Sequence, residues 1–240
     1  KGSQSPEALI LSFFDAIADN AEKYLNGEQR FDLFDNELSV EKVYLGDNGL
    51  DYKQLVQKVL LGAVNFSQGT DDYLDATIDG KGLKSDHTQE EEGKSYTSLE
   101  HQFDEGFGYF GAARDYLEYT DAEIAKKGGR DDYQGMHDTN GDDKIDFKSE
   151  FNFGHSQNAA KRDVGSADNA EPTDFSADAM KAFIKGRDLL RNTAGTALSD
   201  AQMTELLGYR DTAVRAWENA IAATVVHYIN EVREDYDAFG

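Results

Sequence analysis

Apolar residues recur every three or four positions along most of this chain, and the pattern runs longest near the C-terminal end. The residues of that last stripe are Met203, Leu207, Val214, Trp217, Ile221, Val225, Tyr228 and Val232. This spacing places them on one face of an α-helix of roughly eight turns, with a break near Gly208 as an alternative. Because no segment alternates apolar and polar residues as a half-buried strand would, we predict an all-α fold.

Local signals mark where the helices begin. A side-chain oxygen just before a helix accepts a backbone N–H that has no partner in the first turn. The pairs and residues with this pattern are Ser5 before Pro6, Asp51 with Gln54, Thr97 with Glu100, Thr120 with Glu123, and Ser199 with Gln202. A short helix is also expected around residues 39–45, and residues 70–95 and 163–175 are expected to be polar loops.

The predicted architecture is a multi-helix up-and-down bundle with long polar loops, formed as one bundle or as two packed bundles. Only two prolines occur in 240 residues, so little interrupts long helices. We treat residues 1–240 as a single helical domain. The alternative is a pair of sub-bundles, 1–127 and 147–240, joined by an acidic calcium-like loop at 128–146.

Charge and composition exclude several classes of function. The net charge of −23, from 47 acidic and 24 basic residues, repels phosphate, so no nucleic-acid partner is expected. The same surface attracts cations, although a solvated acidic surface explains it equally simply. No apolar stretch approaches the ~20 residues of a transmembrane helix. Because the chain opens with Lys-Gly-Ser rather than Met, we expect a processed form or a fragment, from which any signal segment is already removed.

The chain has no cysteine, so a transition metal would need His, Asp and Glu ligands, and calcium would need oxygens. The clearest local motif is Asp-Thr-Asn-Gly-Asp-Asp-Lys-Ile-Asp-Phe-Lys-Ser-Glu at residues 138–150. Its predicted calcium ligands are Asp138, Asn140, Asp142, the carbonyl of Lys144, Asp146 and Glu150. Alternating oxygens let one tight loop aim several ligands at a hard cation, and the stretch resembles the calcium loop of EF-hand and dockerin-type modules.

Three positions depart from that motif. The EF-hand loop has Gly at its sixth position and Glu at its twelfth, where this chain has Asp143 and Ser149. Glu150 lies one residue late and needs a looser loop to act as the closing ligand. The alternative is a solvated, Asx-rich turn before a helix.

A second candidate site lies on the helix predicted after Thr97. His101 and Glu105 are four residues apart and share a helix face, and Asp104 also neighbours His101. Three glycines follow in the same helix: Gly106, Gly108 and Gly111. Each costs about 1 kcal/mol in a helix interior relative to alanine, so we expect a close approach of another helix or of a ligand. The alternative is a glycine packing seam with a hydrogen-bonded core histidine. His87, in a polar stretch, is expected to be solvated.

Two stretches resemble a known group of proteins. Residues 101–111, His-Gln-Phe-Asp-Glu-Gly-Phe-Gly-Tyr-Phe-Gly, and residues 149–163, Ser-Glu-Phe-Asn-Phe-Gly-His-Ser-Gln-Asn-Ala-Ala-Lys-Arg-Asp, resemble an uncharacterised bacterial envelope family related to the imelysin-like group. The resemblance extends over roughly residues 50–235. It implies paired helical bundles, a periplasmic, cell-surface or secreted location, and a link to iron uptake through a Gly-x-His-x-x-Glu motif.

Only part of that motif carries over. His101 takes the place of the motif histidine and Asp104 that of its acidic residue, whereas Leu99 stands where the motif has Gly. Glu105 is a substitute ligand, and His155 is the best candidate for a second histidine. These residues form the proposed second site, for iron or another divalent metal.

Three functions follow as hypotheses. The first is an extracytoplasmic metal-binding protein that holds calcium in the acidic loop, with a possible iron-type site at His101 and an envelope protein partner. The second is an interaction or adhesion module that calcium stabilises. A metal-dependent hydrolase is disfavoured, because the sequence has neither a His-Glu-x-x-His helix nor a Gly-x-Ser-x-Gly elbow, so we expect no enzyme.

Overall fold

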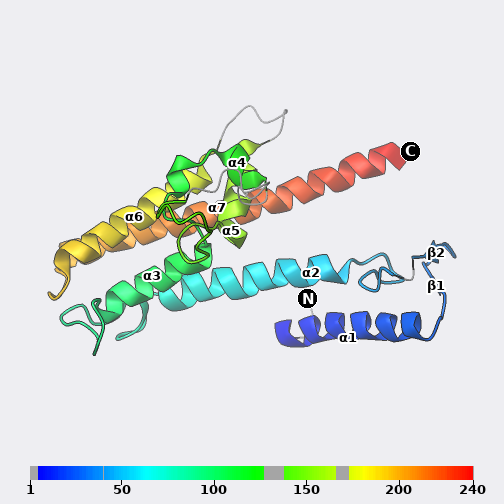
Figure 1. Cartoon of the computed structure of the whole chain (residues 1–240), viewed down its shortest axis with the longest axis horizontal. Helices are drawn as coiled ribbons and strands as arrows, with labels where there is room; N and C mark the ends of the chain where they lie inside the picture. The colour runs from blue at the N-terminus through cyan, green and yellow to red at the C-terminus, as the bar shows by residue number, and fades with distance from the viewer. Residues whose placement is uncertain (1–4, 40, 127–137, 166–172, 240) are drawn as a thin grey trace. The chain divides into compact units, whose positions relative to one another are not determined.

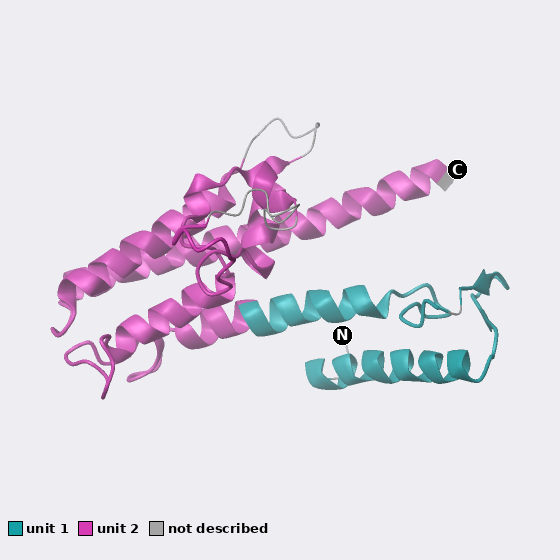
Figure 2. Ribbon diagram, in the orientation of Figure 1, with its two compact units in different colours: residues 1–65 teal, residues 66–240 magenta. Residues whose placement is uncertain are grey.

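The computed structural model describes residues 5–39, 41–126, 138–165 and 173–239 (Figure 1). Within these ranges it contains seven α-helices and a single two-stranded sheet, which confirms the all-α prediction. The chain divides into two compact units, residues 1–65 and 66–240 (Figure 2). This boundary, between residues 65 and 66, differs from the one between the predicted sub-bundles 1–127 and 147–240, which stay a prediction.

The first unit contains two of the predicted helices. Its elements are α1 (Pro6–Leu25), β1 (Arg30–Phe31), β2 (Glu37–Leu38), α2 (Tyr52–Val59) and the π-helical segment η1 (Leu60–Phe66), which reaches the first residue of the second unit. The Ser5 hydroxyl accepts the Ala8 backbone N–H at the start of α1, and the Asp51 carboxylate accepts that of Gln54 at the start of α2. Both helices therefore begin where their capping residues predict.

The helix expected around residues 39–45 does not form. Turns occupy the described part of this segment, after an antiparallel β1–β2 pair in which Arg30 lies opposite Leu38. The buried amide of Asn20, on α1, donates to the carbonyls of Val43 and Leu45 at 2.8 and 3.1 Å. Because a side chain from α1 binds these carbonyls, their hydrogen bonds are satisfied without a helix.

The second unit contains the remaining helices. Its elements are the π-helical segment η2 (Gln68–Tyr73), the 3₁₀ turns η3 (Gly82–Lys84) and η4 (Tyr116–Glu118), α3 (Ser98–Phe110), α4 (Asp121–Ala125), α5 (Gly154–Val164), α6 (Phe175–Thr193) and α7 (Asp200–Phe239). Helices α6 and α7 lie side by side as an antiparallel hairpin (Figure 1). Trp217 of α7 is completely buried in the core of this unit, where its ring meets that of Phe110 at 5.4 Å.

Helix α7 runs unbroken through Gly208, so the predicted interruption is absent. Its apolar stripe is buried only along the first half. Beyond Ile221 the stripe lies in solvent, with Val225, Tyr228 and Val232 being 55%, 44% and 67% exposed. Periodicity therefore predicted the helix correctly, but not which part of its apolar face is covered. None of the described helices is both long enough and apolar enough to cross a membrane.

Helix α3 begins at the predicted capping box, in which Thr97 and Glu100 bond reciprocally. It ends at Gly111, whose φ of +82° is the left-handed conformation that glycine adopts without strain. From Leu99, Phe103, Phe107, Phe110 and Leu117 the spacing predicts one apolar stripe on this helix, but Leu117 lies beyond α3, in η4. Helix α5 lacks a side-chain cap, and its start is held by the Phe153 N–H, which donates to the carbonyl of Gly111 at 2.7 Å.

Candidate calcium loop and the His101 helix

The first half of the acidic loop is organised around Asp138. Its carboxylate accepts the backbone N–H groups of Gly141, Asp142 and Asp143, with N···O distances of 2.6, 3.2 and 2.8 Å. These bonds, that of Asp143 foremost, lower the pKa of Asp138 because they stabilise its charged form. The side chain of Asn140 accepts the N–H of Asp142 in the same manner, at 3.0 Å.

Asp143 adopts the backbone conformation that the EF-hand motif requires at its sixth position. Its φ is +58°, in the left-handed region. An EF-hand loop uses Gly for this sharp turn, and Asp is one of the few other residues that tolerate it. Asp143 therefore makes a left-handed turn despite the departure in residue type.

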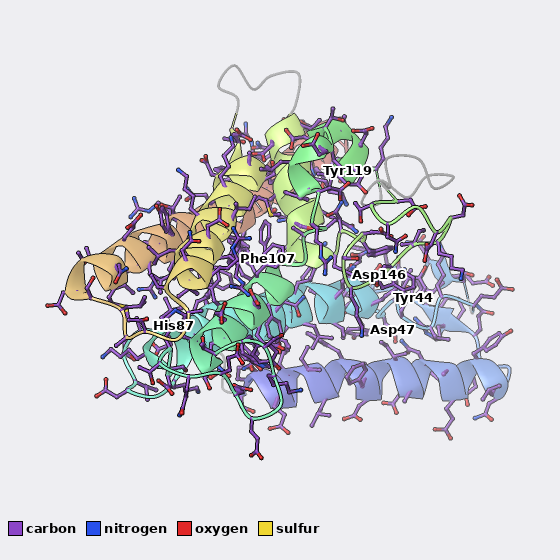
Figure 3. All side chains as sticks on the ribbon, turned by 60° about the vertical axis from the view of Figure 1, so that its left-hand side comes forward. Tyr44, Asp47, His87, Phe107, Tyr119 and Asp146 are labelled. Atoms are coloured by element: carbon purple, nitrogen blue, oxygen red, sulfur yellow. The ribbon has the colours of Figure 1, made fainter. Side chains whose placement is uncertain are left out.

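Glu150 closes the loop. Its side chain is 1% exposed, and one carboxylate oxygen accepts both the backbone N–H and the hydroxyl of Thr139, at 2.8 and 2.7 Å. The other oxygen accepts the backbone N–H of Asp146 at 2.9 Å. The bond from Asp146 foremost, then that from the Thr139 hydroxyl, lowers the pKa of Glu150. A single buried carboxylate thus joins the two ends of the loop. Asp146, in this loop, is labelled in Figure 3.

The loop concentrates negative charge. Residues 138–150 contain five carboxylates against two lysines, Lys144 and Lys148. In the described part of the chain, no ion pair involves any of these carboxylates. Backbone N–H groups bond to Asp138, Asp142, Asp146 and Glu150 instead. One oxygen of Asp138 and one of Glu150 accept a single hydrogen bond each, and each keeps a further lone pair for a cation. Among the described residues, no three His, Asp or Glu side chains are already gathered into a group that could hold a metal.

The His101 helix has a different environment. His101 lies 3.6 Å from Glu105, measured between Nε2 and Oε1, and both side chains are partly exposed. Asp104, predicted as the second ligand, instead pairs with Nε of Arg187 on α6 at 2.8 Å. Burial raises the pKa of Asp104, and the charge of Arg187 acts in the opposite direction.

His155 contacts a separate set of residues. It is 4% exposed, at the start of α5, and its ring lies 5.0 Å from that of Trp217 and 6.5 Å from that of Phe66. The sequence suggested that His155 and His101 bind one ion. In the structure His155 contacts Trp217 and Phe66, whereas His101 contacts Glu105. Their joint role as ligands stays a prediction.

Two features of the second unit were not expected from the sequence. His87, expected in solvent, is 3% exposed and bonds through its two ring nitrogens to the Thr97 hydroxyl at 2.7 Å and the Leu190 carbonyl at 3.1 Å. Its position is labelled in Figure 3. Arg187 also bonds Glu100 at 2.7 Å, so that the α3 capping residue is linked to α6. Since these partners are far apart in sequence, no local pattern indicated either contact.

A family described as a domain of unknown function (DUF4856) matches residues 17–140, and the chain belongs to this family. The matched range includes the His101 helix and ends inside the acidic loop, so residues 149–163 lie beyond it. No curated protein and no solved structure matches the chain significantly. The finer relationship to the imelysin-like group stays a prediction.

Proposed function

We propose that this chain is an extracytoplasmic helical protein that binds calcium in the loop of residues 138–150. The observation that carries the proposal is Glu150, a buried carboxylate that joins the two ends of an acidic loop and pairs with no cation among the described residues. Its lowered pKa keeps it charged at neutral pH. A buried anion without a cationic partner favours the uptake of a cation.

Calcium takes six to eight oxygen ligands in flexible geometry, which suits a loop with both side-chain and carbonyl oxygens. The ligands proposed are the side chains of Asp138, Asn140, Asp142, Asp146 and Glu150 together with the carbonyl of Lys144. The left-handed turn at Asp143 supports this assignment, because the EF-hand loop makes its sharp turn at the same position.

The proposal also includes weak affinity and an extracytoplasmic location. Ser149 occupies the twelfth position, where EF-hand loops have a bidentate Glu, and Glu150 already accepts three hydrogen bonds that calcium would have to share. Extracellular calcium modules bind with dissociation constants of about 10⁻⁴ to 10⁻³ M, an affinity that suits the calcium concentrations outside the cytoplasm. The imelysin-like resemblance supports the same location.

The role proposed for calcium is structural. The segment after the loop is fastened to the end of α3, since the N–H of Arg114 donates to the Ser149 carbonyl and that of Ala113 to the side chain of Asn152. An ion in the loop would stiffen this attachment without performing chemistry. This is also the behaviour expected of a calcium-stabilised interaction module.

The test is calcium titration of the whole chain by calorimetry, with thermal melts in EDTA and in about 10 to 100 mM calcium or magnesium, which is about a hundred times the dissociation constant proposed. Asp142→Asn removes one charge and keeps an oxygen that can accept the Lys144 N–H, as Asp142 does at 2.9 Å. The matched control is Glu218→Gln, which makes the same charge change at an exposed site on α7.

We expect one calcium per chain. At about a hundred times the dissociation constant, the melting temperature should rise by about 5 to 10 °C. Asp142→Asn should bind at least tenfold more weakly, and Glu218→Gln should bind as the wild type does. Two outcomes would refute the proposal. One is that calcium produces no heat of binding and no shift in melting temperature, and the other is that Asp142→Asn binds calcium as tightly as the wild type.

We do not extend the proposal to an iron site at His101. Asp104 is held by Arg187, and His155 lies against Trp217 in the core. A metal at His101 would therefore have to compete with an ion pair for one ligand. Elemental analysis of the purified protein tests this point, because stoichiometric iron or zinc would require a site at His101 after all.

A further inference from the structure

An apolar pocket of about 190 Å³ opens between α3 and α6. Its wall consists of apolar side chains from both helices: Phe103, Phe107, Met180, Phe183 and Ile184. An apolar cavity of about 150 Å³ accepts a benzene molecule, so this pocket has room for one ring or a branched chain of similar size.

The aromatic wall is held in place from within the core. Phe103 and Phe183 are 2% and 3% exposed, and their rings meet edge to face at 5.9 Å. Phe107, labelled in Figure 3, meets Phe183 in the same manner at 5.3 Å. Ile184 lies at the rim and is 40% exposed. Rings fixed by such contacts form a preformed surface that loses little entropy when a ligand binds.

Arginines outnumber acidic residues among the side chains that line this pocket, unlike in the chain as a whole. Two arginines, Arg114 and Arg187, and one aspartate, Asp104, line it, in a chain whose net charge is −23. Arg187 is already neutralised by Asp104 and by Glu100, at 2.8 and 2.7 Å. Among the charged side chains that line the pocket, Arg114 is therefore the one without an ion pair in the described part of the chain.

Arg114 has a fixed backbone and an unpaired side chain. It follows α3, its N–H donates to the Ser149 carbonyl at 2.8 Å, and its side chain is exposed. Among the described residues, its guanidinium makes no hydrogen bond or ion pair, although its charge is the least of the causes that lower the pKa of Asp146. A free guanidinium presents donors that match a carboxylate in a bidentate geometry.

We propose that this pocket binds a small amphipathic carboxylate, with its ring or branched chain against the phenylalanine wall and its carboxylate on Arg114. Charge complementarity selects this occupant over a neutral or cationic one of the same shape. The site needs no metal.

Methionine labelling gives a direct measurement at the site. Met180 lines the pocket, whereas Met203 lies on α7 and serves as an internal reference. The whole chain, labelled with ¹³C-methyl methionine, is titrated with 3-phenylpropionate, the neutral 3-phenylpropan-1-ol and the cationic 3-phenylpropylamine. Each titration is done in EDTA and in calcium, so that loss of this site and loss of the calcium site are distinguished.

We expect 3-phenylpropionate to shift the Met180 signal saturably in both buffers and to leave that of Met203 in place. Arg114→Gln should weaken this binding by about tenfold or more, because a charge-assisted hydrogen bond is lost. Arg233→Gln, an exposed arginine on α7, is the matched control and should bind normally. Ile184→Asn, which alters the partly exposed rim of the apolar wall, should also weaken binding.

Two results would overturn the proposal. The first is an unchanged Met180 signal with all three probes at millimolar concentration. The second is binding of the alcohol or the amine as tight as that of the carboxylate, with no effect of Arg114→Gln, which would mean that apolar contact alone recruits the ring.

Discussion

Two glycines of α3 lie two positions apart and have opposite surroundings. A Cβ built on Gly106 would lie 2.6 Å from Cγ of Leu74, a side chain with 0% exposure. A Cβ built on Gly108 would meet nothing within 4 Å. The expectation that a close approach compensates for the helix glycines is thus confirmed at Gly106, where the neighbour is Leu74. At Gly108 the structure contains no such approach.

The pair allows the cost of overpacking to be isolated. Replacing glycine by alanine in a helix stabilises it by about 1 kcal/mol, and this gain applies to both positions. At Gly106 the new methyl group must displace the buried Leu74, and overpacking of a filled core costs about 1 to 3 kcal/mol. We therefore expect Gly108→Ala to raise the free energy of unfolding by about 1 kcal/mol, and Gly106→Ala to leave it unchanged or lower it by up to about 2 kcal/mol.

The measurement is urea unfolding of the two variants and the wild type, followed by helical circular dichroism. The difference between the variants should be about 1 to 3 kcal/mol, with Gly108→Ala the more stable. Leu74→Ala should cost less stability in the Gly106→Ala background than in the wild type, because it removes the Cγ and Cδ atoms that the new Cβ meets. If Gly106→Ala is as stable as Gly108→Ala, the packing argument at Leu74 is refuted.

Three further predictions concern stability. Asp143→Gly should relieve the left-handed turn and slow proteolysis within residues 138–150, whereas Asp143→Val should accelerate it, as a protease digest will reveal. Burial lowers the pKa of His87 in the folded state, so as the pH falls the unfolded chain takes up this proton before the folded chain does. The stability contributed by neutral His87 is therefore complete above about pH 6.5, and it is lost as the pH falls towards the pKa of His87 in the folded state. Urea unfolding at about pH 7.5 and about pH 5 should detect this loss, and His87→Gln should reduce it. Glu100→Ala removes both a helix cap and the bond to Arg187, which should cost roughly 2 to 3 kcal/mol in the same assay, and Glu100→Gln, which keeps a capping oxygen, should cost less.

Only part of the structure of the acidic loop could be predicted from its sequence motif. The alternating oxygens of residues 138–150 are visible in the sequence, and so is the departure at Asp143. The sequence did not reveal that Asp143 still makes the left-handed turn, or that Glu150, displaced by one position, reaches Thr139 at the opposite end of the loop. Both depend on the path of the backbone through the loop, which residue spacing alone does not determine.

Distance along the chain separates the correct predictions from the incorrect ones. Helix starts were predictable because a capping side chain bonds a backbone N–H only three residues away, as Thr97 does with Glu100 and Ser199 with Gln202. The sequence by itself therefore determined that the protein is helical and where several of its helices begin. Tertiary structure decided the rest: Asn20 bonds the Leu45 carbonyl, Gly111 bonds the start of α5, and the buried His87 bonds the carbonyl of Leu190, 103 residues away. Such contacts form only when distant segments pack together, and a local pattern contains no information about which segments will meet.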